Sequence, residues 1–165
     1  MKKLIKNIYY IGSFYKRMGI DLIYKIAQKM KDKNFYLYGE RKLDKIPTNI
    51  KSADLKIFNF IKYREVPGKL KKADVLIMPH ALDFVGYNSN VKDDISKFTI
   101  PIKMFEYLAS GVPVFSSNLN ALKEILIHKK NSIIVKNNKV EDWVNSIRDL
   151  DNNYRLKKRY LLMLI

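Results

Sequence analysis

Glycines bracket two cations near the start of the chain, in the segment 12–19, which reads Gly-Ser-Phe-Tyr-Lys-Arg-Met-Gly. Gly12 and Ser13 follow a short apolar run, and Lys16 and Arg17 follow in turn. Glycine lets a backbone approach a ligand closely, and a helix that begins after such a loop favours anions at its N-terminus. The segment indicates either a cradle for a diphosphate or a solvated loop whose charges bind nothing.

A second chemical pattern lies in the segment 99–111, Thr-Ile-Pro-Ile-Lys-Met-Phe-Glu-Tyr-Leu-Ala-Ser-Gly. We expect a helix that the proline opens and the glycine ends. Ile102 and Lys103 lie in its first turn, where free backbone N–H groups would meet a phosphate. Glu106, one turn later, could accept hydrogen bonds from ribose hydroxyls. The alternative is that Lys103 and Glu106 form only a weak pair on the protein surface.

Helical spacing divides the same segment into two faces. The expected buried face consists of Ile102, Phe105, Leu108 and Ala109, and the other face of Lys103, Glu106, Tyr107 and Ser110. A third group of small polar residues, which includes Ser117, follows a predicted strand and precedes Glu124 on the next predicted helix. By itself this third group indicates no particular chemistry.

Short apolar runs alternate with amphipathic segments along the chain, which is typical of an α/β sheet built from βαβ units. We expect strands over 7–12, 34–39, 55–61, 74–79, 113–116 and 132–135, and helices over 20–31, 65–72, 101–110, 120–128 and 140–150. The fourth strand is apolar throughout its middle and is therefore expected at the centre of the sheet. The segment 80–99 has no clear period and is predicted to be a functional loop.

These patterns predict a single Rossmann-like domain over residues 1–165, an open parallel sheet of about six strands with helices on both faces. Ligands bind to such sheets beyond the carboxyl ends of the strands, where the three polar segments are expected to lie. The length of 165 residues suits one domain with its own core. Trp143 is expected in that core and His128 at the surface. His80 is expected at the border of the cleft, where contact with the ligand is one of the alternatives.

Composition excludes several classes of site. The chain has no cysteine and only 2 histidines, which excludes disulfides and thiolate zinc sites and disfavours a histidine-rich metal centre. No apolar run is long enough to span a bilayer. The sequence gives no sign of an export signal, because Lys6 and Asn7 interrupt the first apolar residues.

The charge is strongly positive, with 32 Lys and Arg against 16 Asp and Glu and a net charge of +16. The basic residues are spread along the chain and no nucleic-acid-binding module is visible, so nucleic acid is not an expected partner. Two interpretations remain open. The lysines attract the protein to an anionic membrane surface, or an AT-rich genome, indicated by the abundance of Lys, Ile and Asn, raises the number of lysines on any surface.

Together the motifs resemble those of the donor-binding domain of family 4 glycosyltransferases. The resemblance rests on the glycines of 12–19, Tyr-Leu-Tyr-Gly at 36–39, Ala-Asp-Val-Leu-Ile-Met-Pro at 73–79, the block 101–114, and Leu-Lys-Glu-Ile at 122–125. It covers about residues 7–150, with a basic and apolar segment at 151–165. It implies one half of a GT-B enzyme, which grips a nucleotide-diphosphate sugar, needs no cofactor or essential metal, and transfers the sugar with retention of configuration.

The resemblance also implies roles for individual residues. Glu106 matches the second of two family glutamates, which contacts the ribose, whereas the first falls at Phe98. Lys103 would then approach the diphosphate. The Arg and Lys that hold the diphosphate in the family fall at Ser13 and Met18, and Lys16 and Arg17 are candidate substitutes. The base is expected near Gly39 and near Tyr63 and Val66, although Tyr63 is equally a candidate packing residue.

Three hypotheses on function follow. In the first, the chain binds a nucleotide-sugar donor for transfer to a glycan or lipid-linked acceptor, in bacterial surface polysaccharide synthesis, but does not catalyse transfer alone because the catalytic residues of an acceptor domain are missing. In the second, a separate chain supplies that domain. In the third, the chain is a non-catalytic basic binding module. The expected location is the cytoplasm, including the inner face of the plasma membrane.

Overall fold

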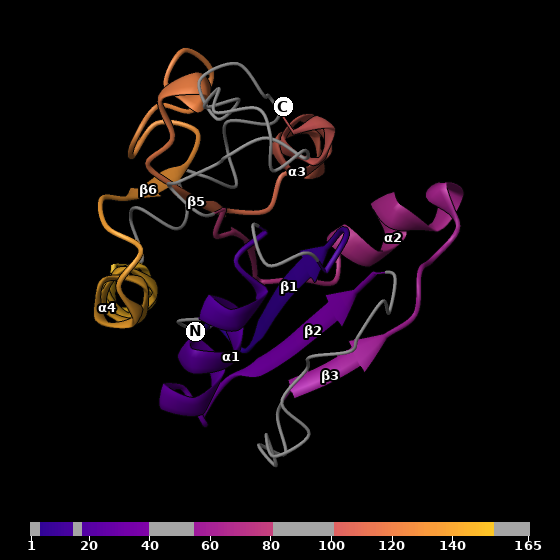
Figure 1. The fold of residues 1–165 in the computed structure, drawn as a ribbon, viewed down its shortest axis with the longest axis horizontal. Helices are drawn as coiled ribbons and strands as arrows, with labels where there is room; N and C mark the ends of the chain where they lie inside the picture. The colour runs from indigo at the N-terminus through magenta and orange to yellow at the C-terminus, as the bar shows by residue number, and fades with distance from the viewer. Residues whose placement is uncertain (1–3, 15–17, 40–54, 81–100, 154–165) are drawn as a thin grey trace, which may run out of the picture.

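A computed structural model describes residues 4–14, 18–39, 55–80 and 101–153 of the chain. They form a parallel sheet of 6 strands in the order β3-β2-β1-β4-β5-β6, with helices on both of its faces (Figure 1). The strands are β1 (Asn7–Ile11), β2 (Asn34–Tyr38), β3 (Leu55–Phe58), β4 (Val75–Met78), β5 (Val114–Ser117) and β6 (Ile133–Val135). The predicted fold class is confirmed, and the apolar fourth strand is central as expected.

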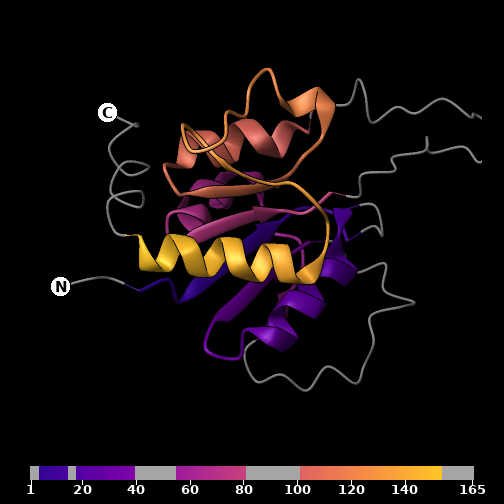
Figure 2. The same ribbon diagram turned by 90° about the vertical axis from the view of Figure 1, so that its left-hand side faces the viewer.

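Two helices cover each face of the sheet. Helices α1 (Ile20–Lys29) and α4 (Val140–Asn152) lie side by side on one face (Figure 2). Helices α2 (Val66–Leu70) and α3 (Ile102–Ser110) lie on the other, and a 3₁₀ turn, η2 (Tyr63–Glu65), leads into α2. Each face has its own apolar cluster, one around Trp143 and Phe35 and one around Met104 and Tyr107. Trp143 is fully buried, as predicted.

Gly12 and Gly39 directly follow β1 and β2, and the backbones of the two glycines are in contact. A Cβ on Gly39 would lie 2.0 Å from the carbonyl oxygen of Gly12, so position 39 cannot carry a side chain at this contact. The N–H of Gly12 donates to the carbonyl of Tyr38 at 2.9 Å. The ends of β1 and β2 are therefore held together, directly below the place where a ligand of the sheet would lie.

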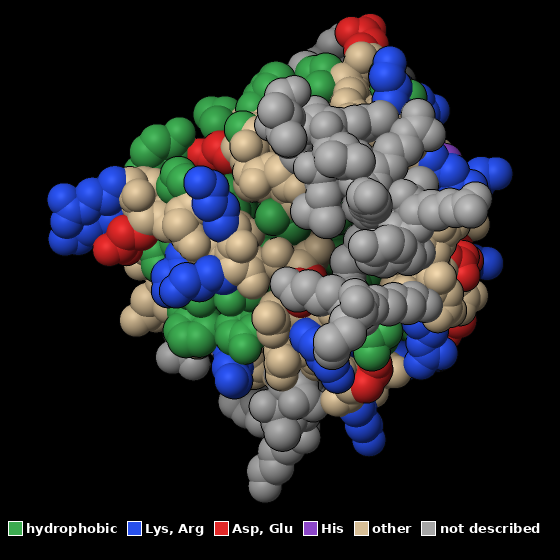
Figure 3. Space-filling model, turned by 180° about the vertical axis from the view of Figure 1, so that it is seen from behind, with side chains coloured by type: hydrophobic (Ala, Val, Ile, Leu, Met, Phe, Trp, Pro, Cys, Tyr) green, Lys and Arg blue, Asp and Glu red, His purple; other side chains and the backbone are tan. Residues whose placement is uncertain are grey.

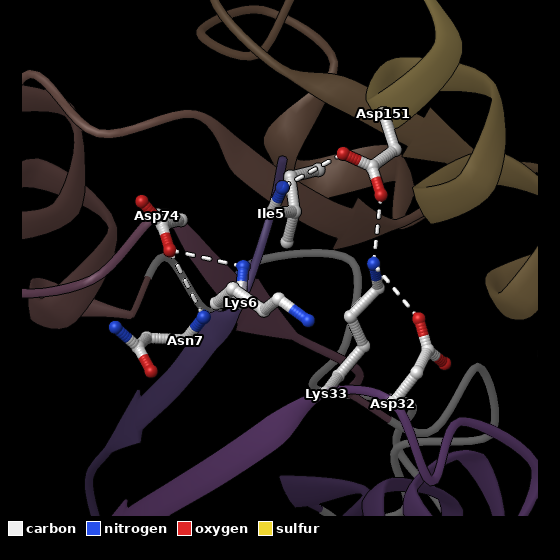
Figure 4. Close-up of polar contacts among 7 residues, drawn as sticks. All are labelled: Ile5, Lys6, Asn7, Asp32, Lys33, Asp74 and Asp151. Carbon is white, nitrogen blue, oxygen red and sulfur yellow. Dashed lines mark hydrogen bonds and ion pairs between the residues drawn. The ribbon is translucent and has the colours of Figure 1, made fainter. Parts of the chain in front are cut away.

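A carboxylate network fixes the opposite, amino-terminal end of the sheet (Figure 4). Asp74 accepts hydrogen bonds from the N–H groups of Lys6 and Asn7, each at 3.0 Å. Asp151, at the end of α4, accepts from the N–H of Ile5 and from the Lys33 ammonium, both at 2.7 Å. This network joins the starts of β1 and β2 to the last turn of α4.

Two predicted elements differ from the structure. The third strand ends at Phe58 rather than at residue 61, because β2 ends at its register partner Tyr38. The helix predicted over 120–128 is only a 3₁₀ turn, η4 (Asn120–Leu122), followed by further turns. The Asn131 amide accepts the N–H of Ile127 and donates to the carbonyl of Ile125, so it binds the backbone groups that a helix would use.

The buried face predicted for α3 is also wrong. Ile102 is 77% exposed and Phe105 53%, whereas Met104 and Tyr107 are fully buried. Tyr107 tolerates burial because its hydroxyl accepts the N–H of Ile11 at 2.8 Å and donates to the carbonyl of Ile11 at 3.2 Å. Helical spacing does not predict this burial, because the hydroxyl makes the tyrosine polar in sequence, whereas both hydrogen-bond partners of the hydroxyl lie inside the protein.

Candidate functional site

The site lies at the carboxyl ends of β1 and β4, where the N-terminus of α3 meets the loop after β1. The helix begins after Pro101, and Gly111 ends it in the left-handed conformation with φ 83°. As in any helix, the first N–H groups, those of Ile102 and Lys103, have no acceptor within the helix. The dipole of α3 therefore places a partial positive charge beside Gly12 and Ser13.

Gly12 makes room for the Lys103 side chain. A Cβ at position 12 would lie 2.5 Å from the Lys103 Nζ, so the ammonium occupies space that a side chain there would need. The Nζ donates a hydrogen bond of 2.8 Å to the Tyr10 hydroxyl and lies 4.4 Å from the centroid of the same ring. The Tyr10 hydroxyl in turn donates to the carbonyl of Ser13 at 2.8 Å.

Lys103 is a cation without a carboxylate partner among the residues that the structure describes. Burial lowers the pKa of Lys103 to about 8, and the charge of Glu106 opposes this shift only in part. The side chain is therefore mostly charged at neutral pH, in a place where water compensates little for that charge. An anion bound at the end of β1 would supply the missing partner.

A pocket of about 380 Å³ lies between α2 and α3. It is lined by Tyr63, Val66, Pro67, Leu70, Lys71, Glu106, Ala109 and Ser110. Tyr63 is 74% exposed, and its hydrogen bond to Glu106 raises the pKa of the Tyr63 phenol, because the neighbouring carboxylate disfavours a phenolate. Three residues predicted to contact the donor, Tyr63, Val66 and Glu106, therefore meet in one hollow.

Two further predicted site residues, Ser117 and Glu124, do not line this pocket. Ser117 is fully buried, and its hydroxyl donates to the Asn138 side chain at 2.9 Å. Glu124 is exposed in the turn after η4 and does not line the pocket. Lys16, Arg17 and Phe98 lie outside the described residues. The donor-binding roles of Ser117, Glu124, Lys16 and Arg17 stay predictions.

Sequence reasoning missed three features of this site. Tyr10 was assigned only to a buried strand, although a buried tyrosine hydroxyl needs a partner, and that requirement was the available signal. Met18 lies with its sulfur 4.0 Å from the Lys103 Nζ. Asn138 donates to the carbonyl of His80 at 2.7 Å, and nothing in its sequence context indicated this contact.

Neither metal ligation nor a membrane span is indicated by the described residues. Within these ranges, no three His, Cys, Asp or Glu side chains gather in a way that could hold a metal ion. No helix in the described part of the chain has the length and apolarity needed to cross a bilayer. Lys and Arg side chains are scattered over the face seen in Figure 3 rather than gathered into one patch.

The sequence profile described as "Glycosyl transferases group 1" matches residues 5–153, nearly the whole chain. The chain belongs to this glycosyltransferase family. Comparison with curated proteins finds no significant sequence match. The family assignment confirms the resemblance inferred from the glycine loops and the 101–114 block.

Solved structures of low sequence identity share the fold. Anabaena Alr3699/HepE, solved in complex with UDP-glucose, is 13% identical with a TM-score of 0.68, over 96% of this chain and 43% of that protein. Sucrose-phosphate synthase from Thermosynechococcus elongatus is 14% identical with a TM-score of 0.75, over 96% of this chain and 39% of that protein.

A C-terminal domain aligns over more of its own length. The C-terminal domain of the glycosyl transferase LpcC from Francisella tularensis is 16% identical with a TM-score of 0.67, over 95% of this chain and 80% of that domain. The chain thus spans less than half the length of HepE and of sucrose-phosphate synthase. Its fold is that of the C-terminal half of a GT-B glycosyltransferase.

Proposed function

We propose that this chain binds the nucleotide-diphosphate sugar of a glycosyl transfer reaction. The observation that carries the proposal is the placement of Lys103 and Glu106 on successive turns of α3. Lys103 points to the end of β1 beside free helix N–H groups, and Glu106 opens into the pocket between α2 and α3. A cation and a helix N-terminus suit a diphosphate, and a carboxylate one turn away suits the hydroxyls of a ribose.

Different residues bind the three parts of the donor, which are the diphosphate, the ribose and the base. The N–H groups of Ile102 and Lys103 hold the diphosphate, together with the Lys103 ammonium and the backbone of Gly12 and Ser13. Glu106 accepts hydrogen bonds from the ribose. Tyr63 and Val66 border the base, since they line the pocket on its far side from α3.

The same groups favour departure of the nucleotide. When the bond from the sugar to the diphosphate breaks, negative charge develops on the leaving phosphate oxygen. The Lys103 ammonium and the dipole of α3 are already oriented toward that charge, so they stabilise the transition state without reorganisation. This chemistry requires no divalent metal, and a chelator is expected to leave donor affinity unchanged.

In this proposal, transfer of the sugar also requires an acceptor domain. An acceptor domain, in the same chain or in a separate one, supplies the remaining catalytic groups, and the sugar is transferred with retention of configuration. The proposed acceptor is a glycan or lipid-linked acceptor of bacterial surface polysaccharide synthesis, reached from the cytoplasmic side of the membrane. Lysines near an anionic lipid surface each contribute about 1 kcal/mol to attraction, which favours peripheral docking of this basic chain.

Calorimetry with UDP-, GDP- and TDP-sugars tests the proposal. We expect one of these donors to bind with a stoichiometry of one, and Glu106→Gln to weaken binding roughly tenfold or more through loss of a charge-assisted hydrogen bond. The matched control is Glu141→Gln, on the exposed first turn of α4, which should leave the affinity unchanged. A chain that binds none of the donors, or an affinity that Glu106→Gln does not alter, favours a non-catalytic basic module instead.

A further inference from the structure

The His80 imidazole is buried with both ring nitrogens unsatisfied. The residue is 2% exposed, and neither Nδ1 nor Nε2 meets a partner in hydrogen-bond geometry in the described part of the chain, although the Met78 backbone lies close enough to favour a proton on the ring. Buried polar atoms of native proteins nearly always have a hydrogen-bond partner. Two ring nitrogens without one therefore indicate that a ligand binds there. The proposed roles of the other residues do not account for this ring.

The position of His80 places the ring on the side of α3. Along β4, Leu76 and Met78 pack in the cluster beneath α2 and α3, whereas Val75 and Ile77 pack beneath α1 and α4. Successive residues of an extended chain alternate between faces, so His80 follows Leu76 and Met78 toward α3. The Pro79 ring lies on the other side, since its Cγ would be 3.0 Å from a Cβ on Gly19 at the start of α1.

The charge state of the ring agrees with this position. Burial lowers the pKa of His80 to about 3, and repulsion by the Lys103 ammonium adds to the shift, although the Met78 carbonyl favours the proton weakly. The ring is therefore neutral at physiological pH, with one N–H donor and one bare nitrogen. The ammonium close by makes the space between the two side chains attractive to an anion.

Two hydrogen bonds fix the backbone of His80. Ser117 donates to the Asn138 side chain at 2.9 Å, and the Asn138 amide donates to the carbonyl of His80 at 2.7 Å. This chain of hydrogen bonds crosses from β5 to the end of β4. It holds the His80 backbone in place without using either ring nitrogen, which leaves both nitrogens available to a ligand.

We propose that His80 is a binding residue for the diphosphate of the nucleotide-sugar, and that its ring N–H donates to a phosphate oxygen that Lys103 also contacts. The proposal rests on the donor-binding function above and adds a residue to it. A neutral imidazole donates to phosphate without adding a second buried cation beside Lys103. Ser117 and Asn138 are then positioning residues, which act through the His80 backbone.

Ring-nitrogen NMR of the intact chain tests this directly, because His80 and the exposed His128 are its only 2 histidines. On addition of UDP-glucose, GDP-mannose or pyrophosphate, we expect the His80 nitrogens to shift and those of His128 to stay. Uridine and guanosine, which lack phosphate, should leave both unchanged. If backbone amides near Glu106 respond to a donor while the His80 ring does not, this inference is wrong and donor binding stands; if no amide responds to any donor, the proposed function itself fails.

Two substitutions at the same position separate hydrogen bonding from packing. His80→Phe keeps the ring and removes the N–H, and it should weaken binding of the donor about tenfold or more. His80→Gln restores a donor group and should keep the affinity within a few fold of the unaltered chain. His128→Phe is the control and should have no effect. Equal affinities for the unaltered chain and a folded His80→Phe would overturn the inference, and should that variant not fold, the ring-nitrogen shifts decide.

Discussion

The Lys103 side chain makes several of the contacts that define the candidate site. Its ammonium contacts Tyr10 by a hydrogen bond and through the face of the ring, and it fills the space that Gly12 leaves open. Burial without a carboxylate partner makes the proton of Lys103 easy to lose. The residue therefore couples ligand binding to protonation, and the sign of that coupling can be tested.

Donor affinity is expected to fall as the pH rises through about 8, the pKa of Lys103 in the free protein. The bound diphosphate favours the charged amine, so binding is strongest below that pKa and weakens toward tenfold per pH unit above it. A nucleotide-sugar is the right ligand, because its diphosphate does not titrate in this range. Calorimetry at several pH values measures the slope.

Lys103→Met is the control for this pH dependence. The variant should bind the donor more weakly at neutral pH, and its affinity should not follow the same slope above about pH 8. An unchanged slope in Lys103→Met would assign the titration to another group. A flat profile in the unaltered chain would mean that Lys103 does not contact the diphosphate.

The elements of the fold were largely predictable, because the signals that define them are local. The apolar runs of β1, β2 and β4 are short, β-rich and closed by Gly or Pro, and the order of βαβ units then determines which ends meet. The faces of α3 could not be assigned in this way, since Tyr107 is buried through a contact with β1, 96 residues away in sequence. The turns after Leu122 depend likewise on the Asn131 side chain.

Only those residues of the candidate site that belong to local motifs could be predicted from the sequence. Gly12, Lys103 and Glu106 follow from motif and topology, because loops at the carboxyl ends of neighbouring parallel strands must meet. The place of His80 at the border of the cleft follows in the same way from its position after the fourth strand. Asn138 and Tyr10 contribute through contacts across strands, and single-residue patterns carry no information on such partners.

The junction between the first loop and α1 gives a prediction at the scale of the element. Gly19 has φ 74°, and a Cβ there would lie 1.6 Å from the Pro79 carbonyl oxygen. Gly19→Ala should therefore destabilise the protein by about 2 kcal/mol or more, because it combines a left-handed conformation with a clash against backbone. Urea unfolding measures the change.

Gly68→Ala is the matched substitution in α2. A Cβ at Gly68 meets nothing within 4 Å, so alanine should stabilise the helix by up to about 1 kcal/mol. Opposite signs for the two substitutions are expected. A Gly19→Ala variant as stable as Gly68→Ala would show that α1 does not pack against the end of β4 as described.

The residues that stabilise the fold and those proposed to bind the ligand lie at opposite ends of the sheet. The carboxylate network at the amino end of the sheet joins α4 to β1 and β2 (Figure 4), whereas the proposed donor site lies at the carboxyl end. The side chain of Lys33 is 4% exposed and is shared by Asp32 at 3.0 Å and Asp151 at 2.7 Å. Changes in this network should reduce stability and leave the architecture of the site intact.

Lys33→Met is expected to lower the free energy of unfolding by about 3 kcal/mol, because it leaves the Asp151 carboxylate without its cation. Lys29→Met, which breaks the exposed pair with Glu141, should cause little or no change. Both values come from urea unfolding, and donor affinity should stay constant in whichever variants remain folded. A loss as small for Lys33→Met as for Lys29→Met would mean that the network does not hold α4 in place.

A crystal structure of the chain soaked with the nucleotide-sugar that binds in calorimetry tests the central claim most directly. The account predicts the diphosphate over the N–H groups of Ile102 and Lys103, the ribose at Glu106, and the base beside Tyr63. A nucleotide bound elsewhere, such as in the hollow between His128 and the end of α4, or a diphosphate without contact to Lys103, would contradict it.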